Sequence, residues 1–175
     1  QEHDEFAKIL RDNGVEVVYL EDLVTEVLDS SPEIKDKFIK QFVKEAGIKS
    51  KKYREAVIDY LKGFGDTKEL VLKTMSGINI NDVTSLEKDS NHSLVDQVME
   101  DMPNLVFTRD PFASIGNGIS LNKMYSVTRN RETIYAEYIF EYHKDYKGTK
   151  KYYDRYNDNH IEGGDILILS DHVIA

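Results

Sequence analysis

Hydrophobic residues recur at helical spacing through most of the first 77 positions. An apolar residue every three or four positions is typical of a helix that packs one face on a core. Five such stripes predict five helices with these apolar positions: Phe6, Ile9 and Leu10; Leu23, Val24, Val27 and Leu28; Ile34, Phe38, Ile39, Phe42 and Val43; Tyr53, Val57, Ile58, Tyr60 and Leu61; Leu70, Val71, Leu72 and Met75.

Cap residues between the stripes support these helices. Ser31 followed by Pro32 is an N-cap with a first-turn proline, and Asp66 three residues before a glutamate suggests a capping box. Glycines suited to helix ends stand at Gly14, Gly47, Gly63, Gly65 and Gly77.

The segments beside the helices differ in character. Val15 to Leu20 is rich in β-branched residues and predicts a buried strand. The stretch after Gly77 is polar and broken, with Asp82 or Ser93 as candidate caps of short turns. We expect residues 1–20 to supply a helix and a strand, and residues 21–100 to form an all-helical bundle used for packing or interaction.

Beyond residue 100, short apolar runs flank one amphipathic stretch, which predicts the order strand, strand, helix, strand, strand. The elements are a strand at 105–107, a glycine turn at 116–118, a strand at 119–123, a helix at 131–146 with apolar face Ile134, Tyr135, Tyr138, Ile139 and Tyr142, a surface loop at 150–159, a strand at 166–169, a turn at 170–171 and a strand at 172–175. Residues 101–175 therefore belong to the α/β class.

Charge and composition narrow the choice of partner. The chain has 175 residues, 40% of them hydrophobic, which is ordinary for a globular protein. With 32 acidic against 23 basic residues its formal charge is -9, so we expect no nucleic-acid partner and no membrane-surface partner. No apolar run reaches the roughly 18–20 residues that span a bilayer.

The sequence contains no cysteine. This excludes a disulfide, a thiolate metal site and a cysteine nucleophile within these residues. It also agrees with a reducing compartment, and we expect a cytoplasmic protein. Because the chain begins without Met and closes on a strand pattern, we expect a fragment of a longer protein.

A polar cluster follows the predicted strand at 105–107. Asp110 precedes Pro111, which favours extended backbone and fixes the direction of the carboxylate. A carboxylate held in this way can accept two parallel N–H bonds from a guanidinium. The alternative, which spacing alone favours, is an Asp-Pro turn with Arg109 as an internal ion-pair partner.

A second cluster runs from His160 to Asp165. Two glycines, which permit a tight turn or the close approach of a ligand, stand between Glu162 and Asp165. A carboxyl group buried here would suit acid–base work. The alternative is a simple turn that leads into a strand. The five histidines are scattered, and we expect no metal site.

Together these motifs resemble the arginine deiminase family. The resemblance is carried by residues 102–114, the Gly116-Asn117-Gly118 turn, the stretch 127–133 and Glu162 to Asp165. It implies a partial five-bladed α/β propeller (the pentein fold), with residues 21–100 as an inserted helical bundle. Residues 1–20 and 101–175 would then be propeller modules.

The resemblance also implies a reaction, the hydrolysis of L-arginine to L-citrulline and ammonia through a cysteine-bound intermediate, without metal or cofactor. It gives Asp110 and Glu162 the role of contacting the guanidinium, and Glu162 also that of orienting a catalytic histidine. Asn104 and Arg129 would hold the amino-acid end of the substrate. Phe107 would line the pocket, and Asp165 would support the site.

The sequence differs from the family pattern in one respect. The nucleophilic cysteine and the catalytic histidine of the family belong to later motifs that these residues do not contain, so we expect the 175 residues alone to be inactive. Two alternatives stay open: a related enzyme acting on agmatine, methylated arginine or peptidyl-arginine, and a non-catalytic homologue that binds arginine or a protein. We also expect association with copies of itself, as a homo-oligomer.

Overall fold

The computed structural model describes residues 2–83, 97–102, 104–170 and 173–174. Its helices are α1 (Glu2–Asp12), α2 (Leu20–Asp29), α3 (Pro32–Glu45), α4 (Lys51–Lys62), α5 (Thr67–Ser76), α6 (Val127–Asn130) and α7 (Thr133–Tyr142), with 3-10 turns η1 (Ile80–Asp82) and η2 (Gly163–Asp165). Its strands are β1 (Ile78–Asn79), β2 (Gln97–Met99), β3 (Phe112–Ile115), β4 (Gly118–Leu121), β5 (Lys150–Tyr153), β6 (Ile168–Ser170) and β7 (Val173–Ile174).

The five helices predicted in the first 77 residues are confirmed. The hydroxyl of Ser31 accepts from the N–H groups of Glu33 and Ile34, and the carboxylate of Asp66 accepts from that of Glu69. Gly77 has φ 78°, which favours glycine at the end of α5. The β1–β2 pair adds a small sheet to the expected all-helical bundle. The candidate cap Ser93 lies outside the described residues, as does Asp171 of the turn predicted at 170–171.

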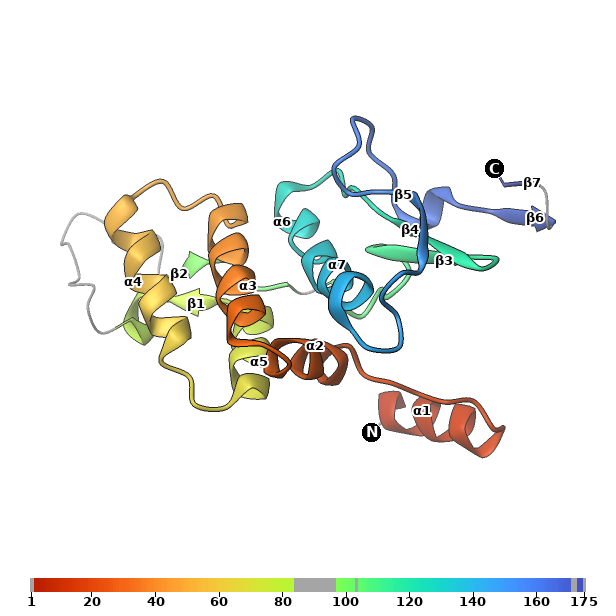
Figure 1. Cartoon of the computed structure of the whole chain (residues 1–175), viewed down its shortest axis with the longest axis horizontal. Helices are drawn as coiled ribbons and strands as arrows, with labels where there is room; N and C mark the ends of the chain where they lie inside the picture. The colour runs from red at the N-terminus through yellow and green to blue at the C-terminus, as the bar shows by residue number, and fades with distance from the viewer. Residues whose placement is uncertain (1, 84–96, 103, 171–172, 175) are drawn as a thin grey trace.

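Helices α2 to α5 share one hydrophobic core with α7 (Figure 1). Helix α2 packs against α3, α5 and α7. The ring of Phe38 on α3 meets that of Tyr138 on α7 edge to face, with centroids 5.2 Å apart. The hydroxyl groups of Thr74 and Tyr135 lie 3.0 Å apart inside this core. The helical bundle and the later α/β segment are therefore packed together.

The sheet of the second half is built around the predicted glycine turn. Strands β3 and β4 form an antiparallel hairpin in which Phe112 pairs with Leu121, and Gly116 at φ 53° turns the chain. Strand β5 lies parallel to β4, with α6 and α7 in the connection. The side chain of Ala136 on α7 packs on Ile119 and Leu121 of β4. The mixed α/β class is confirmed.

Two predicted strands are wrong, because each lacks a neighbouring strand to pair with among the described residues. Residues 15–19 have no regular structure, and Val15 and Val18 stay about half exposed. Residues 105–107 lie in consecutive turns, in which the N–H groups of Phe107 and Asp110 donate to the carbonyls of Asn104 and Phe107. The strand begins only after the proline, at Phe112.

Three further boundaries differ from prediction. The expected helix at 131–146 is confined to Thr133–Tyr142, preceded by the short α6. The expected loop at 150–159 contains β5, which completes the sheet beside β4. The strand expected at 166–169 is shifted to Ile168–Ser170, where it pairs with β7.

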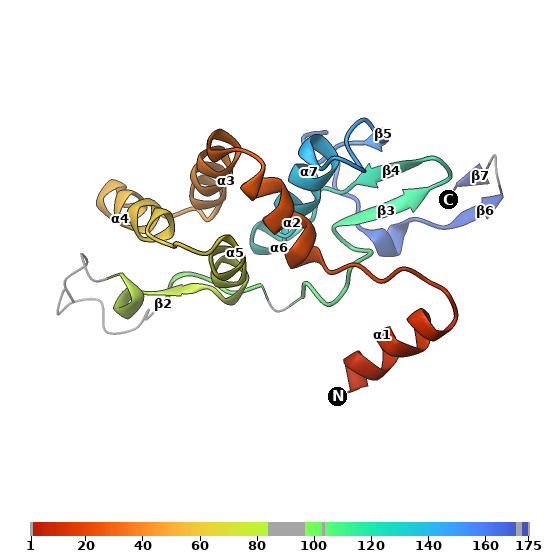
Figure 2. The ribbon, with the colours of Figure 1, turned by 60° about the horizontal axis from the view of Figure 1, so that its bottom comes forward.

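Figures 1 and 2 show that α1 stands away from the bundle and the sheet. Its apolar stripe is correspondingly open, and the side chain of Phe6 is 61% exposed. None of the described helices combines the length and apolar character that crossing a membrane requires.

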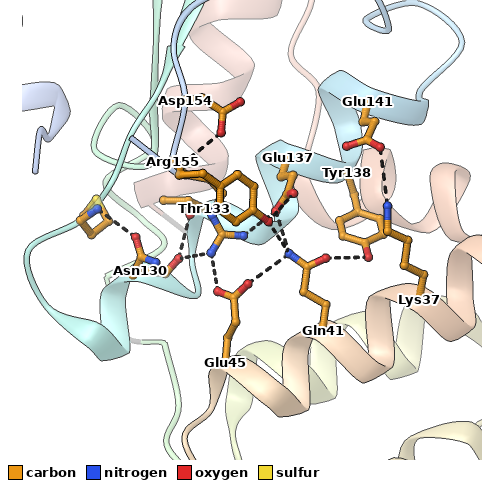
Figure 3. Close-up of polar contacts among 12 residues, drawn as sticks. Lys37, Gln41, Glu45, Asn130, Thr133, Glu137, Tyr138, Glu141, Asp154 and Arg155 are labelled. Carbon is orange, nitrogen blue, oxygen red and sulfur yellow. Dashed lines mark hydrogen bonds and ion pairs between the residues drawn. The ribbon is translucent and has the colours of Figure 1, made fainter. Parts of the chain in front are cut away.

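A buried ion network joins α3, α7 and the segment after β5 (Figure 3). The guanidinium of Arg155, 1% exposed, pairs with the carboxylates of Glu45 on α3 and Glu137 on α7. The amide of Gln41 donates to Glu137 at 2.9 Å and accepts from the hydroxyl of Tyr138 at 3.0 Å. Burial lowers the pKa of Arg155, but its carboxylate partners raise it more, so the guanidinium stays charged.

The close contact between the two polar motifs is a backbone contact. A Cβ atom on Gly163 would overlap the carbonyl group of Arg109. The guanidinium of Arg109 also donates to the carbonyl of Ile166, beyond the second motif. The predicted turn at Asp110-Pro111 is present, but Asp110 pairs with Arg129, whereas the guanidinium of Arg109 bonds the Ile166 carbonyl.

Replacing Arg155 with Met should lower the free energy of unfolding by about 3–5 kcal/mol, because it leaves two carboxylates without their buried cation. Urea denaturation of the chain measures this. Lys151→Met is the matched control, since its 3.4 Å pair with Asp154 lies nearer the surface and should contribute less than about 1 kcal/mol. Equal losses in the two variants would contradict the assigned role of Arg155.

Replacing Gly163 with Ala should destabilise the chain by about 2 kcal/mol or more, because the added methyl group meets rigid backbone. Gly164→Ala tests the adjacent position, where an added Cβ meets nothing within 4 Å. Thermal unfolding should therefore separate the two variants. A Gly163→Ala variant as stable as Gly164→Ala would show that the two motifs do not approach this closely.

Candidate functional site

The guanidinium of Arg129 lies among three carboxyl groups. Its Nη2 atom is 2.9 Å from Oδ2 of Asp110 and 3.4 Å from Oε2 of Glu132, and its Nη1 atom is 3.5 Å from Oε2 of Glu162. The four residues come from the turn before β3, the α6–α7 segment and the residue before η2. The two motifs singled out in the sequence therefore meet at one cation.

The turn before β3 is held by buried polar groups. The side-chain NH2 of Asn122 donates to the backbone carbonyl of Asp110 at 2.8 Å, and the Oδ1 atom of Asn122 accepts from the hydroxyl of Ser120 at 2.6 Å. The sequence pattern places Ser120 and Asn122 on the polar side of a strand, but both are buried. A buried asparagine side chain needs hydrogen-bond partners, and the carbonyl oxygen of Asp110 is one of them.

The carboxylate of Glu162 is oriented by backbone. Its Oε1 atom accepts from the N–H of Tyr125 at 3.1 Å, and its own N–H donates to Oδ2 of Asp165 at 2.9 Å. The 123–125 and 160–162 segments are linked by an isolated antiparallel bridge between Lys123 and Ile161. Asp165 thus holds the backbone of Glu162.

The electrostatics of the site favour a bound cation. Side-chain exposures are 20% for Arg129, 25% for Asp110, 30% for Glu162 and 1% for Glu132. Burial raises the pKa of Glu132, although Arg129 opposes the change. Burial lowers the pKa of Arg129, but the bond to Asp110 and the charge of Glu132 outweigh it, so that pKa is raised. Three carboxyl groups share one guanidinium, which leaves them able to accept further N–H donors.

The predicted site residues fall into two groups. The structure brings Asp110, Glu162 and Arg129 together, with Asp165 behind Glu162. Asn104 and Phe107 lie in the turns that precede Asp110, and Phe107 is 56% exposed. The substrate roles of all six stay predictions.

The sequence reasoning missed Glu132 and Asn122. Glu132 carried a usable signal, because it lies three residues after Arg129, the spacing at which helical side chains meet. Asn122 could have been found only by knowing that its strand lies beside the turn at Asp110.

Two other features bear on ligands. Among the described residues, no group of three or more His, Cys, Asp or Glu side chains is arranged to hold a metal ion. A mainly apolar cavity of about 490 Å³ lies between the segment before α2, the β3–β4 hairpin and α7, and Glu132 is its charged wall residue. This cavity adjoins the carboxylate cluster rather than containing Asp110 and Glu162.

Comparison with known proteins gives a uniform result. The family model described as "Arginine deiminase" matches residues 1–175. Proteins named "Arginine deiminase" from Treponema denticola, Streptococcus pneumoniae and Clostridium perfringens are 54%, 49% and 45% identical over 180, 183 and 181 residues. Each alignment covers 100% of this chain and 44% of the relative. With its whole length matched by the family model, the chain belongs to the arginine deiminase family.

Proposed function

We propose that these residues form the guanidinium-binding half of an enzyme that hydrolyses L-arginine to L-citrulline and ammonia. The observation that carries the proposal is the convergence of Asp110 and Glu162 on one guanidinium, that of Arg129. Two carboxylates from separate motifs that already hold this group have the spacing and charge to hold the same group of a substrate. Family membership and the names of the relatives support the choice of L-arginine.

In this proposal Arg129 occupies the place of the substrate guanidinium until the substrate binds. It keeps the carboxylates of Asp110 and Glu162 from repelling each other. When L-arginine binds, its guanidinium takes over those carboxylates. The side chain of Arg129 then turns, together with Asn104, to the substrate's α-carboxylate and α-amino group. Phe107 lines the pocket, and Asp165 keeps Glu162 in place.

The chemical step needs groups that these residues do not supply. In the family reaction a cysteine thiolate attacks the guanidinium carbon, and ammonia leaves. Water then hydrolyses the covalent intermediate, releasing citrulline and restoring the thiolate. The 175 residues contain no cysteine, so we expect turnover only in a polypeptide that carries them and spans the length of the relatives. Asp110 and Glu162 contribute by holding the reacting carbon in line with the nucleophile.

The finer architecture belongs to the same proposal. We infer that residues 1–20 and 101–175 are parts of a five-bladed α/β propeller and that residues 21–100 are inserted between them. The hairpin β3–β4 with β5 and α7 supports one such module. A cytoplasmic, self-associating enzyme completes the proposal.

Asp110→Asn and Glu162→Gln, made in a polypeptide spanning the relatives' length, should each lower kcat/KM for L-arginine by about 100-fold, because each removes a charged acceptor from the guanidinium. Citrulline formation measures this. Agmatine as a competing substrate tests the preference for L-arginine. Asp158→Asn, an exposed carboxylate, is the control. Full activity in either site variant, or a preference for agmatine, would overturn the assignment.

A further inference from the structure

His160 is a residue of the second motif that the proposed reaction leaves unused. Its Nδ1 atom lies 3.0 Å from the carbonyl oxygen of Met124. A carbonyl oxygen only accepts, so Nδ1 carries a proton and donates. The imidazole therefore holds the oxygen end of the peptide unit that joins Met124 to Tyr125.

The nitrogen end of that peptide unit is held by Glu162. The N–H of Tyr125 donates to Oε1 of Glu162 at 3.1 Å. Because a peptide unit is planar and rigid, whatever fixes its carbonyl also fixes the direction of its N–H. Hydrogen bonds at the two ends of one peptide also polarise each other in the same sense. His160 and Glu162, two positions apart in sequence, are thus joined through one peptide.

Other hydrogen bonds fix the backbone just before this peptide unit, but they do not involve the Met124 carbonyl. The N–H of Ile161 donates to the carbonyl of Lys123 at 3.0 Å, and the N–H of Met124 donates to Oδ1 of Asn130 at 3.1 Å. The ring of Tyr125 meets that of His160 edge to face, with centroids 5.5 Å apart. These contacts bring His160 to the 124–125 peptide, where its Nδ1–H donates to the Met124 carbonyl.

We propose that His160 is a positioning residue for Glu162. Its bond to the Met124 carbonyl keeps the Tyr125 N–H on Oε1 of Glu162. The other oxygen, Oε2, is thereby left directed at the guanidinium site, where it now contacts Arg129 at 3.5 Å. This inference rests on the proposed function, because it gives the orientation of Glu162 its purpose.

Two substitutions separate the donor from the ring. His160→Phe keeps an aromatic ring against Tyr125 and removes the N–H, whereas His160→Asn removes the ring and keeps an N–H donor bonded to Cγ. In the chain itself, the amide proton resonance of Tyr125 should move upfield in the Phe variant and stay near its parent position in the Asn variant. An unmoved resonance in the Phe variant, or equal shifts in both, would overturn the proposal. The amide resonances of β3 report whether each variant keeps its fold.

The kinetic arm uses a polypeptide that spans the relatives' length. His160→Phe should lower kcat/KM for L-arginine about ten-fold, because the Glu162 carboxylate then loses its hydrogen bond from the Tyr125 N–H. His160→Asn should recover most of the lost activity. His3→Phe in α1 controls for the change of residue type. Equal losses in the Phe and Asn variants would overturn the proposal. A parent that forms no citrulline would contradict the proposed function, while the Tyr125 resonance would still decide the position of His160.

Discussion

The guanidinium of Arg129 is the interaction on which the rest of this site depends. It pairs with carboxyl groups from three segments of the chain, and without it Asp110 and Glu162 would repel each other in a partly buried setting. Two carboxylates stay close together in such a setting when a cation lies between them, and Arg129 is that cation. The site thus already contains the type of group that we propose it binds.

Two other constraints bring the segments to Arg129. The missing side chain of Gly163 lets the second motif lie directly on the backbone of Arg109, one residue before Asp110. The buried cation of Arg155 ties α3 and α7 to the segment after β5, and that segment leads into the second motif. Helix α7 packs in the core of the helical bundle and begins immediately after Glu132, so the packing of the bundle helps to fix the position of Glu132 in the carboxylate cluster. Packing and electrostatics are coupled through these few residues.

The parts predictable from sequence are those decided by nearby residues. Helices α2 to α5 each carry their own apolar stripe, and the predicted caps Ser31 and Asp66 mark the starts of α3 and α5. These local features were enough to predict the four helices. The strands expected at residues 15–20 and 105–107 depended on distant partners, and their β-branched composition could not show that no strand lies beside them in the described structure. Arg155, in a stretch expected to be a surface loop, is buried because Glu45 meets it from 110 positions away.

The candidate site divides in the same way. Asp110 and Glu162 were selected by local chemistry, a carboxylate before a proline and another beside paired glycines. Their meeting at Arg129 could not follow from local pattern, and the nearer Arg109 was the more obvious partner. Asn122 supports Asp110 from 12 positions away, and the N–H of Tyr125 supports Glu162 from 37 positions away. Local spacing rules do not predict contacts at these separations.

The most direct test is a structure with L-arginine bound to a polypeptide that carries these residues, spans the relatives' length and has its nucleophilic cysteine replaced by alanine. We expect the substrate guanidinium within hydrogen-bond distance of Asp110 and Glu162, with the side chain of Arg129 moved to the substrate's α-carboxylate. L-arginine bound elsewhere, with the pairs from Arg129 to Asp110 and Glu162 intact, would contradict it.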